Sequence, residues 1–359
     1  MNLNFRENSA WAIVVPSSMG VRILPLGGQA VHNSDSFLLT VCSAETNVAT
    51  VACSLGMQAK VLTAFVEDSP IARIIKDNLR SRNIQYEGPE VPQGGPWGYR
   101  HQFNIADSGY GSRGPRVHND RTGEVGQTLN AMNYDLDRVF GKEGAQIVHM
   151  SGLVAALSPE SGEFCLAVAE AAKRHGSLVS FDINYRASFW ENREKELRET
   201  FSKIAAVADI LVGNEEDFQL ALGIEGPKHG GKDLDSNIEN FKQMINRVKD
   251  KYSGGKVFGT TLRQVISVNE HLWGSIMLLG DEWDVITPRP IHVLDRIGGG
   301  DGFVGGMLYG LLKGWPVGKC NAFGWASGAF ATTVLTDYAM PADEQQIWSI
   351  FEGNARVKR

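Results

Sequence analysis

The stretch Asp295-Arg296-Ile297-Gly298-Gly299-Gly300-Asp301-Gly302-Phe303 decides how this chain of 359 residues is interpreted. Its three consecutive glycines carry no side chains, so their backbone N–H groups can approach an anion closely. The apolar residues that follow recur at helical spacing: Phe303, Met307, Leu308, Leu311 and Leu312. We therefore expect a helix that begins at Gly298, Gly299 and Gly300, where unpaired N–H groups and the helix dipole favour negative charge.

Asp301 directly follows the glycines. A carboxylate beside a bound anion is placed to take a proton from an incoming hydroxyl. A glycine cradle, a helix start and an adjacent acid are together typical of a phosphoryl-transfer site. The alternative is a tight turn in which Asp301 caps the helix. The stretch alone leaves both interpretations open, because glycine-rich motifs have many false positives.

Composition narrows the class of protein. The hydrophobic fraction of 43% is enough for a sizeable core, and the net charge of −6 argues against a nucleic-acid surface. Cys42, Cys53, Cys165 and Cys320 show no metal-ligand spacing and are typical of free thiols in a reducing compartment. The chain has no apolar run long enough to span a bilayer, and its polar N-terminus lacks a signal-peptide profile. We therefore expect a cytoplasmic protein with a small-molecule substrate and no nucleic-acid or membrane partner.

Strand-like and helical patterns alternate along most of the chain. They predict strands at 11–15, 61–66, 145–150, 178–183, 210–212 and 256–261, a hairpin about Gly280-Asp281, and helices at 46–55, 70–80, 159–175, 191–207, 216–222, 238–251, 302–313 and 317–335. Such alternation predicts an α/β fold with a mostly parallel sheet covered on both faces. Sheets of this kind bind ligands at the carboxyl ends of their strands, and the glycine stretch lies at such a junction.

Residues 92–123 break this pattern. Glycine and proline are dense there, and aromatic residues alternate with polar ones. We expect a β excursion that forms a flap, with an ordinary surface loop as the alternative, since loops of this length are uncommon and usually functional. Arg121 in the flap could cover an anionic substrate and exclude water as the site closes. The alternative, which the sequence alone favours, is an exposed loop arginine.

Polar residues follow three of the predicted strands. The segment Asn214-Glu215-Glu216-Asp217 suits Mg²⁺, which prefers oxygen ligands, or else a helix start with dipole-favoured acids. Arg186 could clamp a carboxylate or phosphate with two N–H groups, or else pair with Asp182. Thr261 and Arg263 fit nucleotide phosphates, with plain polarity at a turn as the alternative.

Taken together, these motifs resemble those of the ribokinase-like (phosphofructokinase-B) carbohydrate kinases. Residues 295–303 are similar to the family signature ending Gly-Ala-Gly-Asp-x-Phe, with Gly299 in the alanine place. Residues 214–217 are similar to the Asn-x-x-Glu magnesium motif, with Asp217 in the glutamate place. The resemblance runs from about Ile13 to the C-terminus.

Within that family the chain looks most like the 2-keto-3-deoxygluconate kinases. Residues 181–190 resemble their Asp-x-Asn-Tyr-Arg-x-x-x-Trp segment, and residues 261–263 and 356–359 also fit. The resemblance implies a ribokinase-like fold, with a mostly parallel central sheet flanked by helices. It implies one kinase domain over 1–359 whose small β-sheet lid is formed by about 17–42 and 92–121. It further implies ATP and Mg²⁺ as cofactors. Because an open lid sheet has edges that often pair with those of a partner, we also expect a homo-oligomer, a dimer through the lid.

The resemblance also assigns roles to individual residues. Asp301 would be the catalytic base, with Gly298, Gly299 and Gly300 as the anion hole. The remaining assignments are substrate binding by Cys42, Ser43, Asn47, Arg121 and Arg186, ATP binding by Thr261, Arg263, Gly298 and Gly300, and metal binding by Asn214 and Asp217.

Three departures from the family pattern lie in the segments that the resemblance assigns to the sugar acceptor. Cys42-Ser43 stands where the family has Gly-Gly, Ser17-Ser18 where a glycine and an acid are usual, and Asn119 where an aromatic residue is expected. We predict an ATP-dependent kinase that phosphorylates a primary hydroxyl of 2-keto-3-deoxygluconate or a related sugar acid. The alternatives are a kinase of a neutral ketose such as fructose, or a catalytically silent sugar- or nucleotide-binding regulator.

Overall fold

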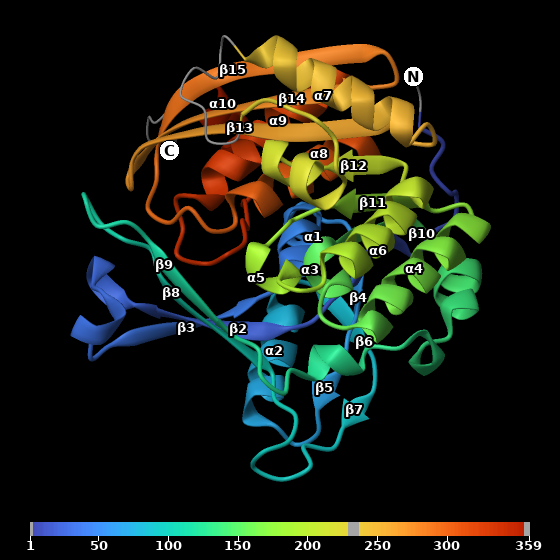
Figure 1. Ribbon diagram of the computed structural model, residues 1–359, viewed down its shortest axis with the longest axis vertical. Coiled ribbons are helices and arrows are strands. Elements are labelled where there is room, and N and C mark those ends of the chain that lie inside the picture. Colours follow the sequence, from blue (N-terminus) through green and yellow to red (C-terminus); the bar gives the residue numbers. More distant parts are fainter. Residues whose placement is uncertain (1–2, 229–236, 355–359) are drawn as a thin grey trace.

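In the computed structural model, residues 3–228 and 237–354 are described. Their main feature is a nine-stranded sheet with the order β15-β14-β13-β12-β11-β10-β1-β4-β6 (Figure 1). Its strands are β1 (Trp11–Pro16), β4 (Ala59–Leu62), β6 (Ile84–Glu87), β10 (Ala145–Ser151), β11 (Leu178–Asp182), β12 (Ile210–Val212), β13 (Val257–Ser267), β14 (Glu270–Leu279) and β15 (Glu282–His292). The C-terminal residues 356–359 that contribute to the resemblance lie outside the described part of the chain.

The direction of the strands matches the expected α/β class. All strands from β13 to β6 run parallel, as the alternation of strands and helices predicted. The chain then adds β14 and β15 as an antiparallel hairpin about Gly280-Asp281. The carboxyl ends of the parallel strands therefore lie at one edge of the sheet, which is where such sheets bind ligands.

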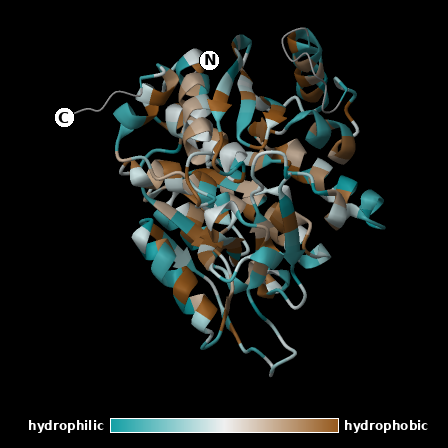
Figure 2. Ribbon diagram, turned by 90° about the vertical axis from the view of Figure 1, so that its left-hand side faces the viewer, coloured by the Kyte–Doolittle hydropathy of each residue, from teal (hydrophilic) through white to brown (hydrophobic). Residues whose placement is uncertain are grey.

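Helices cover both faces of this sheet because strand residues alternate between two cores. Val14 packs in one core, whereas its neighbours Ile13 and Val15 pack in the other. The first face carries α3 (Gly152–Ala155), α4 (Pro159–Arg174), α6 (Glu194–Val207) and α7 (Ile238–Lys251), and the second carries α1 (Ala44–Ser54), α2 (Pro70–Ser81), α8 (Gly299–Leu312), α9 (Val317–Ala331) and α10 (Glu344–Phe351). Figure 2 shows hydrophobic segments gathered between these layers.

Local sequence signals explain where several helices begin. The hydroxyl of Ser43 accepts a hydrogen bond from a backbone N–H in the first turn of α1, and Ser69 does the same for α2. Ser158 and Ser161 form a reciprocal capping box at the start of α4. Such caps satisfy N–H groups that have no partner inside the helix. Of the described helices, none has both the length and the apolar character needed to cross a bilayer.

A second, smaller sheet projects beside the main body, toward the lower left in Figure 1. Its order is β3-β2-β8-β9, built from β2 (Gly20–Pro25), β3 (Phe37–Cys42), β8 (Gln102–Asp107) and β9 (Arg116–Asp120). Segments far apart in the sequence thus pair, since β2 and β8 are parallel neighbours. A further pair, β5 (Phe65–Val66) and β7 (Glu90–Val91), shows that the strand expected at 61–66 is interrupted after Leu62.

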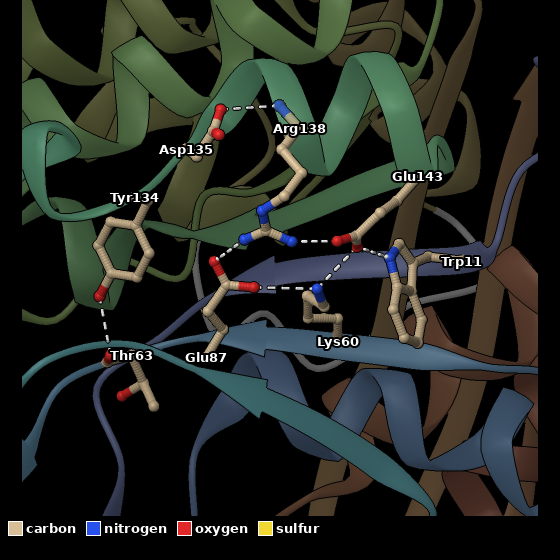
Figure 3. A network of polar contacts seen from close by, with 8 residues as sticks. All are labelled: Trp11, Lys60, Thr63, Glu87, Tyr134, Asp135, Arg138 and Glu143. Atoms are coloured by element: carbon tan, nitrogen blue, oxygen red, sulfur yellow. Dashed lines mark hydrogen bonds and ion pairs between the residues drawn. The ribbon is translucent and has the colours of Figure 1, made fainter.

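A network of charged side chains connects β4 and β6 of the main sheet to the helical segment that carries Arg138 and Glu143 (Figure 3). Lys60 Nζ lies 3.0 Å from Glu87 and 2.7 Å from Glu143, and Arg138 forms ion pairs with both acids. The ammonium of Lys60 also lies 4.7 Å from the ring centre of Trp11. Two cations thus balance two carboxylates, which lets these half-buried charges lie close together at low cost.

Candidate active site

A cleft of about 910 Å³ opens at the carboxyl ends of the parallel strands. Its walls include the last residues of β11 and β12, residues of three strands of the small sheet, and the loop that leads into α8. It brings together nearly all of the residues that the sequence analysis assigned: Cys42, Ser43, Asn47, Arg121, Arg186, Asn214, Asp217, Thr261, Arg263, Gly298, Gly300 and Asp301. Residues drawn from many separate segments therefore meet in a single cavity.

Gly299 is the assigned residue that does not line the cleft. It is buried, and a β-carbon there would lie 3.1 Å from the Thr332 side chain. Gly300 instead faces open space and is exposed in the cleft. Gly299 can therefore act on a bound anion only through its backbone N–H.

The loop before α8 depends on the absence of a side chain at Gly298. This residue has φ of 87°, and a β-carbon on it would lie 2.1 Å from the carbonyl oxygen of Asp337. Gly302 N–H donates the first helical bond to the Gly298 carbonyl, at 2.8 Å. The N–H groups before Gly302 therefore lack helical partners and are available to an anion, as the glycine stretch predicted.

Asp301 is the third residue of α8, and its carboxylate lies in the cleft. Asn47 Nδ2 on α1 donates a hydrogen bond of 2.9 Å to Asp301 Oδ2. Burial raises the pKa of Asp301 to about 7, although the bond from Asn47 opposes the rise. A carboxyl group with a pKa near neutrality can both accept and release a proton at physiological pH, as a general base must.

Asn214 and Asp217 lie in the cleft but are bonded to backbone. Asn214 N–H donates to Asp217 Oδ2 at 2.7 Å, and Asp217 N–H donates back to Asn214 Oδ1 at 2.9 Å. Tyr185 N–H donates to the other oxygen of Asp217 at 2.7 Å. Burial raises the pKa of Asp217 to about 6. This pair therefore shapes the loop after β12, which agrees with the helix-start alternative.

A buried arginine connects the small sheet to the glycine loop. Arg22 on β2 is fully buried and forms ion pairs with Asp295 at 2.5 Å and with Asp337 at 2.7 Å. Ser108 Oγ, just after β8, donates to Asp295 Oδ2 at 2.8 Å. The loop that carries the glycines is thus held by two strands of the other sheet. Nothing in the apolar run around Arg22 indicated this role.

Comparison with known proteins decides the family. Residues 125–343 match the pfkB family carbohydrate kinase. The chain belongs to the pfkB family of carbohydrate kinases. It is therefore a sugar kinase, a phosphotransferase with an alcohol group as acceptor. The sequence-based expectation of a ribokinase-like α/β fold with a small separate sheet is confirmed.

Individual relatives of this pfkB-family kinase act on keto-deoxy acids, by their names. The chain is 26% identical to 2-dehydro-3-deoxygalactonokinase of Haloferax volcanii over 94% of its own length and 96% of that protein. The crystal structure of 2-dehydro-3-deoxygluconokinase from Thermotoga maritima matches with a TM-score of 0.86 and 25% identity, over 96% of this chain and 98% of that one. A 5-dehydro-2-deoxygluconokinase of Clostridium beijerinckii is 31% identical, but the match covers 54% of this chain and 51% of that protein.

The wall of the cleft around Cys42 and Ser43 contains a carboxylate that was not expected from the sequence. Glu45, in the first turn of α1, is buried and accepts hydrogen bonds from Ser17 Oγ at 2.6 Å, from Ser43 Oγ at 3.2 Å and from Ser151 Oγ. Ser17 is the first of the two serines that replace the usual glycine and acid. Glu45 therefore places a carboxylate next to the position where the family pattern usually has an acid.

Glu124 supplies a second unexpected carboxylate. It is fully buried, accepts a hydrogen bond from Ser18 Oγ, and binds Arg121 through both oxygens, at 2.9 and 2.8 Å. The guanidinium of Arg121 also lies 5.2 Å from the ring centre of Phe189. Arg121 thus enters the cleft with its charge already paired. Its spacing of three residues from Glu124 was the signal that could have indicated the pair.

Proposed function

We propose that this sugar kinase transfers the γ-phosphate of ATP to a primary hydroxyl of 2-keto-3-deoxygluconate or a closely related sugar acid. The observation that carries the proposal is the Asp301 carboxylate, oriented by Asn47 at 2.9 Å beside the start of a glycine-rich helix. The names of two relatives that cover nearly the whole chain support the substrate class.

The mechanism follows from this geometry. Asp301 accepts the proton of the acceptor hydroxyl as the hydroxyl oxygen attacks the γ-phosphorus, and the bond to the bridging oxygen of ADP breaks. The backbone N–H groups at the start of α8 stabilise the charge that develops on the transferred group. Asn47 fixes the direction of the carboxylate, so the base does not have to be oriented during the reaction.

Each end of the cleft has its own role in this proposal. Thr261 and Arg263 contact the nucleotide phosphates together with Gly298 and Gly300, while Arg186, Asn47 and the Cys42–Ser43 segment contact the acceptor. Burial raises the pKa of the Cys42 thiol, so Cys42 acts as a neutral contact.

Mg²⁺ fits the cleft through water better than through direct ligands. Within the described residues there is no group of three or more acidic, histidine or cysteine side chains arranged to hold a metal ion. Both carboxylate oxygens of Asp217 already accept backbone N–H groups, but the residue and Asn214 still line the cleft. We therefore assign Asn214 and Asp217 to a hydrated Mg²⁺, which would neutralise phosphate charge when bound.

The small sheet is the proposed lid, formed by segments near 17–42 and 92–121 of a single domain over 1–359. Its residues Arg121 and Val117 line the cleft, so it can cover the acceptor. Phe37 and Leu39 are 43% and 40% exposed, which supports a homodimer formed through this sheet. Because ATP is the substrate and the four cysteines are unpaired thiols, we propose that the enzyme acts in the cytoplasm.

A neutral ketose such as fructose is the second candidate acceptor, because Glu124 already neutralises Arg121. ATP turnover should be measured against keto-deoxy acids, aldonic acids and free ketoses, for the natural chain and for Arg186→Glu. The proposal predicts turnover of a keto-deoxy acid that the charge reversal reduces far more than any turnover of ketoses. Equal losses on both classes would favour the ketose, and no turnover across the panel would favour a silent regulator.

A further inference from the structure

Three guanidinium groups line the cleft, those of Arg186, Arg263 and Arg296, and none of them forms an ion pair with a carboxylate of the described residues. In the described part of the chain, the only hydrogen bond from any of them runs from Arg186 to the carbonyl of its neighbour Tyr185, at 2.7 Å. Arg121 in the same cleft shows the contrast, because Glu124 binds it through two oxygens. An anion that occupies this end of the cleft would meet unpaired cations.

The three groups are close enough to repel one another. Burial and the charge of Arg186 lower the pKa of Arg296, although Asp295 opposes the shift. Burial and the charge of Arg296 lower the pKa of Arg263 to about 10, and Arg186 acts in the same direction while Glu215 opposes it. Because Arg263 is exposed, repulsion by the neighbouring arginines explains its lowered pKa better than burial does. Mutual repulsion of this kind is relieved when a multiply charged anion binds between the cations.

The backbone at Arg296 is held rigidly. Asp295, the preceding residue, is fully buried and bound by Arg22 and Ser108, and its Oδ1 also accepts Ile297 N–H at 3.0 Å. Gly298, two residues later, packs against the Asp337 carbonyl. The half-buried Arg296 side chain therefore extends into the cleft from a fixed point next to the anion-binding helix start. A preorganised cation loses little freedom on binding.

We propose that Arg296 binds the β- and γ-phosphates of the nucleoside triphosphate together with Arg263, while Arg186 remains a contact to the acceptor. The sequence analysis gave Arg296 no role. A sugar acid offers a single carboxylate, whereas a triphosphate carries several negative charges, so the triphosphate matches the neighbouring cations Arg263 and Arg296 better. This inference rests on the proposed kinase function and assigns its phosphate-binding residue.

The test is equilibrium binding of ATP and AMP to the whole protein by calorimetry, without an acceptor. Arg296→Met should weaken ATP binding by about tenfold or more, the loss expected for one charge-assisted contact, and should change AMP binding by less than about twofold. The ATP affinity of Arg296→Lys should lie between those of the natural chain and Arg296→Met, because lysine keeps the positive charge but lacks the paired N–H donors of a guanidinium. The matched control is Arg73→Met, an arginine of α2 whose side chain is 77% exposed.

Two results would overturn the inference. One is unchanged ATP binding in Arg296→Met, whether or not the variant requires more acceptor acid, and the other is an equal loss of ATP and AMP binding. Thermal melting of each variant checks that it is folded, and inorganic tripolyphosphate binding repeats the comparison without the adenosine. The proposed kinase function fails separately, if the natural chain turns over no acceptor while its ATP binding still depends on Arg296.

Discussion

Asn47 Nδ2 on α1 lies 2.9 Å from Asp301 Oδ2 on α8. The two helices approach closely because Gly305 has no side chain: a β-carbon there would lie 2.5 Å from the Val48 carbonyl oxygen. Helix packing therefore places an amide against the carboxylate, and 254 residues of sequence separate the two partners. The relationship links a packing feature of the core to the protonation of the proposed base.

Replacing Asn47 with alanine should shift the pH dependence of catalysis. The Asn47 hydrogen bond lowers the pKa of Asp301, so its loss should raise that pKa above its present value near 7. The acid limb of kcat/KM should then move to higher pH, with a reduced rate at pH 7. Steady-state kinetics between pH 5 and 9 measure the shift, and an unmoved limb would contradict the assignment of Asp301.

Asp301 should also make folding stability depend on pH. Its folded pKa near 7 lies above the ordinary value of 3.8, so the folded state binds more protons between these values. Stability should therefore fall as pH rises from about 4 to 7, and it should stay lower above pH 7. Asp301→Asn removes this penalty and should melt at a higher temperature than the natural chain at pH 8, with little difference near pH 4.

Thermal unfolding at constant ionic strength measures this effect. Asp250→Asn, at an exposed position on α7, is the matched control and should leave the pH dependence as it is. Parallel melting curves for the natural chain and Asp301→Asn across this range would show that the carboxyl group is not perturbed in the folded state.

Arg22→Met should destabilise the protein by about 3 to 5 kcal/mol, because it leaves Asp295 and Asp337 buried without a cation. The charge of Asp337 already raises the pKa of Asp301, so the loss of Arg22 should raise that pKa further. Denaturant melts and the pH profile of kcat/KM measure the two effects. A variant that also carries Asp337→Asn should recover the pH profile, and failure to do so would contradict the charge coupling.

Glu124→Gln should strengthen binding of an acidic acceptor. The change keeps a hydrogen-bond acceptor next to Arg121 but removes the charge that neutralises it. We expect KM for a keto-deoxy acid to fall several-fold while KM for ATP stays the same. If the variant instead improves turnover of a neutral ketose, Arg121 does not recognise a carboxylate.

The sequence predicted the parts of the fold that depend on local pattern. Apolar runs and helical periodicity located most strands and helices, and three glycines before an apolar run located the start of α8. The pairing of one strand with another could not be predicted from such local patterns. Strand β13 continues to Ser267, beyond the expected end at 261, because β14 pairs with it along most of its length. The short edge strand β6 was missed, since its few residues carry no clear period.

The residues of the candidate site also fall into two groups, those with a local sequence signal and those that only the fold brings together. Asp301, Arg186 and Asn214 were visible because each follows a strand or a glycine turn. Arg22 was not visible, because its partner Asp337 lies 315 residues away and an arginine inside an apolar strand gives no local signal. Glu45 was hidden for a similar reason, since an acid in the first turn of a helix is ordinary until Ser17 and Ser151 are brought against it.

Turnover by Asp301→Asn, compared with the natural chain on a keto-deoxy acid and ATP, is the most direct test of whether Asp301 is the catalytic base. We predict a loss of about three or more orders of magnitude in kcat, the upper part of the range for a general base, with ATP binding retained. Near-normal turnover in a folded variant would contradict the role of Asp301 as the base and with it the proposed mechanism.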